Sequence, residues 1–188
     1  MNTLDYNSIG QRAYATAQEK GWYAEGGPDF GTRIALIHSE ASEALEAYRN
    51  NWICSSETLS YLLNAPTFEH DFFVANIKST VGDELADVVI RCCEALAHFV
   101  VDANAVKIGD MVRDTGNSFG DAICRLHSYI GLIHFNKHQK EQMHGYMVKT
   151  AIYAGLIAKT QNIDIASHIE AKLRYNTMRP HKHGGKKF

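Results

Sequence analysis

The sequence contains no long apolar run: nowhere in its 188 residues does one approach the roughly 18 residues that a membrane-spanning helix needs. It also has no basic segment followed by an apolar one at its start, so nothing indicates a secretory signal. The four cysteines (Cys54, Cys92, Cys93 and Cys124) include no Cys-x-x-Cys spacing, which argues against a zinc or disulfide framework. We therefore expect a cytoplasmic protein whose cysteines are reduced core residues and whose function involves no membrane.

Patterns typical of several enzyme folds are also missing. No segment of any length alternates apolar and polar residues as a strand would, and there is no internal repeat. Because no strand leads into a glycine-rich loop, P-loop and dinucleotide-binding folds are excluded. The absence of a Gly-x-Ser-x-Gly motif argues against an α/β-hydrolase. With 45% hydrophobic and 21% charged residues, the chain has the composition of an ordinary globular domain.

Apolar residues recur at helical spacing through most of the chain, which predicts an all-α bundle of about five to six helices. The expected helices cover residues 3–20, 30–49, 68–99, 118–136, 139–161 and 162–176, the third with a break near Gly82. Residues 50–66 are expected to form a connection with room for a short helix, and residues 102–117 another break. Asp164 and the two residues before it are typical of a helix cap.

The stretch Gly82–Arg91 holds two carboxylates three residues apart, Glu84 and Asp87, on a helix that is apolar over most of its circumference. Such a helix is mostly enclosed by other helices, so its narrow polar strip faces water or an internal cleft. A second pair lies on the second predicted helix, with Glu40 inside the apolar sector and Glu43 at its margin. We expect the two helices to face each other and their four acids to hold a divalent metal ion.

The polar strip is crowded with like charges, since Asp83, Glu84 and Asp87 lie within about one turn. Arg91 is the one local counter-charge, and like charges at this spacing are destabilising without a partner. The alternative interpretation is a pair of solvated helix faces held by contacts such as Asp87–Arg91. The position of both acid pairs against apolar sectors favours the metal site.

Basic residues gather at the end of the chain. Residues 172–188 contain six Lys or Arg and no acid, whereas residues 1–171 hold the other 13 basic residues against all 21 acids. This asymmetry fits a tail that binds nucleic acid. It fits equally well a site in which metal-holding acids and phosphate-holding bases come from opposite ends of the chain.

The order of these motifs resembles that of the MazG-like, all-α nucleoside triphosphate pyrophosphohydrolases. That family has a Glu-x-x-Glu helix followed by a Glu-x-x-Asp helix, here Glu40-x-x-Glu43 and Glu84-x-x-Asp87. The segment Lys20-Gly21-Trp22 before the first pair and the basic ending of the chain are also similar to family members. The 40 residues between the two acid pairs form a longer spacer than is usual there.

The resemblance implies Mg²⁺-dependent hydrolysis of a nucleoside triphosphate to the monophosphate and pyrophosphate, with Mn²⁺ as an alternative ion. It implies a catalytic bundle at residues 1–171, a basic segment at 172–188 that completes the site, and a homodimer or homotetramer; nucleic acid is not the expected partner. The implied metal ligands are Glu40, Glu43, Glu84 and Asp87, and one of the first two also steers or deprotonates the attacking water. Candidates to bind the substrate are Lys172, Asn176, Arg179, Lys182, His183 and Lys186 for the phosphates, and Trp22 or Tyr175 for the base.

Two other functions stay open. A di-iron carboxylate bundle also uses inward-facing glutamates, but it needs two Glu-x-x-His motifs, and the sequence has one obvious case, Glu141-x-x-His144. The second alternative is a non-catalytic helical interaction protein, for example a nucleic-acid binder that uses the basic tail.

Overall fold

The computed structural model describes residues 4–24, 26–106, 114–185 and 187. Over these ranges the protein is helical with no strand, which confirms the expected all-α fold. The helices are α1 (Tyr6–Glu19), α2 (Phe30–Arg49), α3 (Ser56–Asn64), α4 (His70–Asn76), α5 (Val81–His98), α6 (Phe119–Phe135), α7 (Lys140–Thr160), α8 (Ile165–Met178) and α9 (Lys182–Gly185). The count in this part of the chain exceeds the expected five to six, because the segment between α2 and α5 holds two short helices and the tail holds one more turn.

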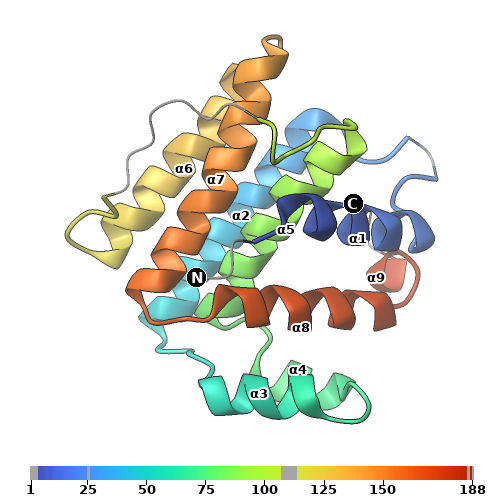
Figure 1. Ribbon diagram of the computed structural model, residues 1–188, viewed down its shortest axis with the longest axis vertical. Coiled ribbons are helices and arrows are strands. Elements are labelled where there is room, and N and C mark those ends of the chain that lie inside the picture. The colour runs from blue at the N-terminus through green and yellow to red at the C-terminus, as the bar shows by residue number, and fades with distance from the viewer. Residues whose placement is uncertain (1–3, 25, 107–113, 186, 188) are drawn as a thin grey trace.

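Helix α5 lies at the centre of the bundle, as its nearly all-round apolar surface predicts. Helices α1, α2, α7 and α8 pack against it, and α6 packs on α2 and α7 (Figure 1). From Val81 to Ile90 every residue except Asp87 is buried. Because this stretch includes Asp83 and Glu84, the packing that stabilises the bundle also places two carboxylates in its interior.

Side-chain caps fix where most of the helices begin. In six of them an N-cap side chain accepts a hydrogen bond from a backbone N–H of the first turn, at Asp5, Asp29, Ser55, Thr80, Ser118 and Asp164. Asp164 confirms the cap predicted for α8, and that helix ends at Met178, close to the expected Asn176. The third residue of the predicted cap segment therefore defines the start of the helix that carries Lys172 and Asn176.

The helix expected over residues 68–99 is in fact two helices, α4 and α5, and the break lies at residues 77–80, before Gly82. Ser79 has a positive φ of 61°, which interrupts the helical path. The Asp83 carboxylate accepts a hydrogen bond from the Ser79 backbone N–H at 2.9 Å, so the turn is held from inside the next helix. Gly82 is thus a residue of the first turn of α5 and does not end a helix.

The two short helices α3 and α4 do more than connect α2 to α5. They pack against α8 and, with it, enclose a small second core whose members are Leu59, Leu62, Phe73, Ile77, Ala171 and Tyr175. In Figure 1 they lie on the side of α8 that faces away from the long helices. The longer spacer between the acid pairs therefore supports the helix that bears Lys172 and Asn176.

Two expectations drawn from composition, on membrane helices and on the cysteines, can be compared with the structure. Over the part of the chain that the structure describes, no helix combines the length and apolar character needed to cross a membrane. All four cysteines are free, and Cys92 and Cys93 are buried in α5 as expected. The expectation of a core position is wrong for Cys54, which is half-buried, and for Cys124, which is exposed. Cys124 lies on the exposed face of α6, which among the described helices packs on α2 and α7.

Candidate functional site

Three of the four predicted metal ligands come together where α2 faces α5. Glu40, Glu84 and Asp87 each place one carboxylate oxygen within 4.8 Å of the others. Glu40 and Glu84 are buried, and Asp87 is half-buried at the edge of a pocket. We call these three residues the acid cluster. A compact set of oxygen donors is what a hard cation such as Mg²⁺ prefers.

The fourth predicted ligand, Glu43, lies one turn after Glu40 on α2 but is exposed. Its carboxylate accepts a hydrogen bond from the Ser39 hydroxyl at 2.8 Å. It does not belong to the acid cluster, although it lies close enough for its charge to act on Glu40. Its role as a ligand or as the residue that steers water stays a prediction.

Glu84 is the most unusual member of the acid cluster. The residue is 3% exposed, and among the described residues its carboxylate forms no hydrogen bond or ion pair, although the charge of Lys172 acts on it. Burial, and after it repulsion from the Asp87 carboxylate, raise the pKa of Glu84 to about 9. Burial and the Asp87 carboxylate also raise the pKa of Glu40. A buried carboxylate without a partner costs several kcal/mol or stays protonated, so this position fits a residue that binds a cation.

Arg91 pairs across the helix interface and not along its own helix. Its Nε and Nη2 atoms both lie 2.7 Å from Glu40 Oε1. The local Asp87–Arg91 ion pair of the alternative interpretation is not formed, because Arg91 extends from α5 to α2. The acids are therefore not held as a solvated surface face, and one of the two cations that contact them within the described residues comes from α5 itself.

The second cation is Lys172 of α8, a residue that is 5% exposed. Its ammonium group lies 2.7 Å from Asp83 Oδ2 and 2.7 Å from Asp87 Oδ2. Burial acts to lower the pKa of Lys172, but the carboxylates of Asp87, Asp83 and Glu84 raise it above its usual value, so the group is charged. Neither the pairing of Lys172 with acids nor the part of Asp83 in it was predicted, since 89 residues separate the two partners.

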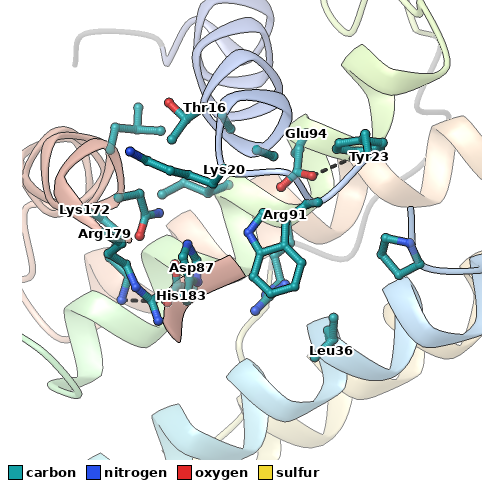
Figure 2. A pocket seen from close by; sticks show the side chains of 17 residues that line it. Thr16, Lys20, Tyr23, Leu36, Asp87, Arg91, Glu94, Lys172, Arg179 and His183 are labelled. Carbon is teal, nitrogen blue, oxygen red and sulfur yellow. Dashed lines mark hydrogen bonds and ion pairs between the residues drawn. The ribbon is translucent and has the colours of Figure 1, made fainter. Parts of the chain in front are cut away.

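A cavity of about 170 Å³ opens beside the acid cluster, between α1, α5, α8 and the tail. Six predicted site residues line it: Trp22, Asp87, Lys172, Asn176, Arg179 and His183. Figure 2 shows Asp87, Lys172, Arg179 and His183 on one side of this pocket, and Tyr23 and Glu94 on another. The structure thus brings acids from the middle of the chain and bases from its end to one place.

Arg179 stands out among these bases. It makes no ion pair with any described residue, and its guanidinium carbon lies 5.6 Å from the centre of the Tyr175 ring. Burial lowers the pKa of Arg179. Nearby, the Oδ1 atom of Asn176 is buried and has no hydrogen-bond partner among the described residues. Both groups line the pocket with unused hydrogen-bonding capacity.

Of the other predicted substrate contacts, Tyr175 and Lys182 do not line the pocket. Tyr175 is buried in the second core, and its ring stacks on Phe73 with 4.4 Å between ring centres. The guanidinium group of Arg179 packs over this ring. The backbone N–H of Lys182 donates to the carbonyl of Lys20 at 2.9 Å, which ties the tail to the end of α1. Lys186 lies outside the described residues.

The pocket also contains residues that were not predicted. The Tyr23 hydroxyl donates to Glu94 Oε1 at 2.7 Å and accepts from Arg33 Nη1 at 2.6 Å, which closes one wall. Lys20 lines the pocket from the end of α1. Its place next to Gly21 and Trp22 was visible in the sequence, but no spacing rule connects it to the acids.

Close approach of α8 to α5 depends on Gly82. The buried ring of His168, one turn before Lys172, lies where a side chain at position 82 would be. We expect Gly82→Ala to lower the free energy of unfolding by about 1–3 kcal/mol, because the ring must shift. In the double variant Gly82→Ala/His168→Ala the loss should be smaller than the sum of the single losses by at least about 1 kcal/mol. Denaturant unfolding of the four proteins measures this coupling; strictly additive losses would contradict it.

Comparison with known proteins gives no match to the chain. No protein-family model matches it, and neither a curated protein nor a solved structure does. The function therefore has to be inferred from the residues and their geometry.

Proposed function

We propose that this protein is a Mg²⁺-dependent nucleoside triphosphate pyrophosphohydrolase, which releases pyrophosphate and a nucleoside monophosphate. The observation that carries the proposal is Glu84, a buried carboxylate without a partner among the described residues, within 4.8 Å of oxygens of Glu40 and Asp87. The resemblance of the two acid pairs to the MazG-like family supports the choice of reaction.

The charges around the acid cluster fit one divalent cation. Glu40, Asp83, Glu84 and Asp87 carry four negative charges when ionised, while Arg91 and Lys172 pair with them as two positive charges. The remaining charge of minus two equals that of one Mg²⁺ with opposite sign. Glu40, Glu84 and Asp87 would hold the ion. When bound, it supplies an activated water and neutralises charge on the phosphates.

The chain's own residues would orient the substrate. Arg179 is free of ion pairs with described residues and would bind phosphate oxygens through paired N–H groups. Lys20, at the end of α1, adds a second charge to the lining of the pocket. Trp22, whose ring meets His183 edge-on with 5.1 Å between ring centres, offers an aromatic surface in the same pocket for the base. Glu43 is the candidate to orient the attacking water.

Replacement of Arg179 tests the phosphate side of the site. We expect Arg179→Gln to raise the KM for the nucleotide about tenfold or more, because a charge-assisted hydrogen bond to phosphate is lost. Arg174→Gln is the matched control: it removes the same charge from α8, the helix that Arg179 directly follows, but Arg174 pairs with Glu170 at 2.8 Å and does not line the pocket. Equal effects of the two variants would show that only the total charge of the tail matters.

The activity itself is tested by a pyrophosphate-release assay with purified protein. The substrates are the ribo- and deoxyribonucleoside triphosphates and their common damaged forms, each with Mg²⁺, with Mn²⁺ and with a chelator. We expect metal-dependent release with at least one nucleotide. No release above background with any of them would contradict the proposal.

The other candidate functions have less support. In the described residues the acid cluster contains no histidine, and Glu141 and His144 lie on α7, with His144 packed against Phe99. A di-iron site is therefore disfavoured, and the iron content of the purified protein checks this. A non-catalytic interaction protein would have no reason to bury Glu84 without a partner. The homodimer or homotetramer implied by the family resemblance stays a prediction.

A further inference from the structure

We propose that Lys172 is a built-in counter-ion of the acid cluster, which competes with the divalent cation for Asp87 and so sets how tightly the metal binds. This inference rests on the proposed function, because it assumes that the cluster binds a metal ion. It goes beyond that function by assigning a regulatory role to a residue expected only to contact substrate.

The first argument is the position of the ammonium group. Lys172 Nζ lies 2.7 Å from an oxygen of Asp87, and Asp87 belongs to the acid cluster. Its charge also acts on Glu84, a second member of the cluster. A positive charge this close to two ligands opposes the entry of another cation, and in a poorly solvated site this opposition is much stronger than it is in water.

The second argument is that Lys172 has a separate anchor. Asp83 is fully buried and lies outside the acid cluster. Its Oδ2 atom accepts hydrogen bonds from the Lys172 ammonium group and from the backbone N–H of Ser79. Its other oxygen has no hydrogen-bond partner among the described residues. When Asp87 turns toward a metal ion, Lys172 can remain paired with Asp83, so it need not become an isolated buried charge.

The third argument concerns the metal-free protein. Asp83, Glu84 and Asp87 repel one another on one helix, and Lys172 is the cation that contacts two of the three. Without a metal ion, the ammonium group thus supplies part of the positive charge that these carboxylates need. The same ion pairs hold α8 against α5. Because Lys172 also lines the pocket, the same group lies where the substrate phosphates are expected.

The test measures metal binding without nucleotide, by isothermal titration with Mn²⁺ and by the melting temperature with and without Mn²⁺. We expect Lys172→Gln to melt at a lower temperature than the wild type without metal, and to bind Mn²⁺ at least about tenfold more tightly. The double variant Lys172→Gln/Asp83→Asn, which restores the net charge, should bind Mn²⁺ with nearly the wild-type affinity. Lys159→Gln, an exposed position at the end of α7, should leave the affinity unchanged.

If Lys172→Gln does not fold, the comparison is made between Asp83→Asn and Asp83→Asn/Lys172→Gln, and the second should bind Mn²⁺ more tightly. An unchanged or weaker affinity on loss of Lys172 would overturn the inference and leave a purely structural ion pair. Failure of the proposed function has a different signature, because then neither the wild type nor any of these variants would bind Mn²⁺.

Discussion

Glu84→Gln is expected to lower the rate of pyrophosphate release by at least about 100-fold, since even residues that only support a metal ligand typically contribute 10–100-fold. The substitution keeps the shape of the side chain and removes the negative charge that a divalent cation needs. The same change should leave the metal-free fold at least as stable as the wild type, because a buried amide is less costly than a buried unpaired carboxylate. Steady-state kinetics and thermal unfolding measure the two effects.

Two companion variants make this result specific. Glu46→Gln removes the same charge from α2 at an exposed residue that pairs with Arg49, and it should leave the rate unchanged. Asp87→Asn should also abolish turnover, but with some loss of stability, because it weakens the contact with Lys172. If Glu84→Gln and Asp87→Asn both keep normal turnover, the acid cluster is not a catalytic metal site.

Gly10→Ala is expected to destabilise the protein by about 2 kcal/mol, although alanine is the better helix former. Gly10 lies on the buried face of α1, where a methyl group would be 2.5 Å from the backbone carbonyl oxygen of Cys93 in α5. A backbone atom inside a helix cannot move aside, so α1 must shift as a whole. The shift would also displace Lys20 and Trp22 in the pocket. Denaturant unfolding with an unchanged m-value measures the loss.

Gly131→Ala provides the control of opposite sign. Gly131 lies inside α6, and apart from its own helix backbone no atom of the described residues lies within 4 Å of the added methyl group. The substitution should therefore stabilise the protein by about 0.5–1 kcal/mol through helix propensity alone. If both variants change stability in the same direction, the close contact of α1 with α5 is not what requires glycine at position 10.

The central place of α5 illustrates how well local pattern predicts burial. Its residues are apolar around nearly the whole helix, and a helix of that kind can be stable in water only when other helices cover it. The bounds of α2 also follow directly from its apolar stripe and its Asp29 cap. The break expected near Gly82 is also present, at residues 77–80, but its exact place is set by the backbone turn at Ser79, which leaves no sign in the sequence comparable to a glycine.

The amino-acid sequence by itself determined the fold class, the two acid pairs and the basic end of the chain, because helical periodicity and charge distribution are properties of neighbouring residues. Only the tertiary structure decided which partner each charge takes. Arg91 contacts Glu40 and not Asp87, Lys172 contacts Asp83 and Asp87 across 89 and 85 positions, and Glu43 points to solvent. Ion pairs between distant segments depend on how helices pack, and the packing is set by the whole core.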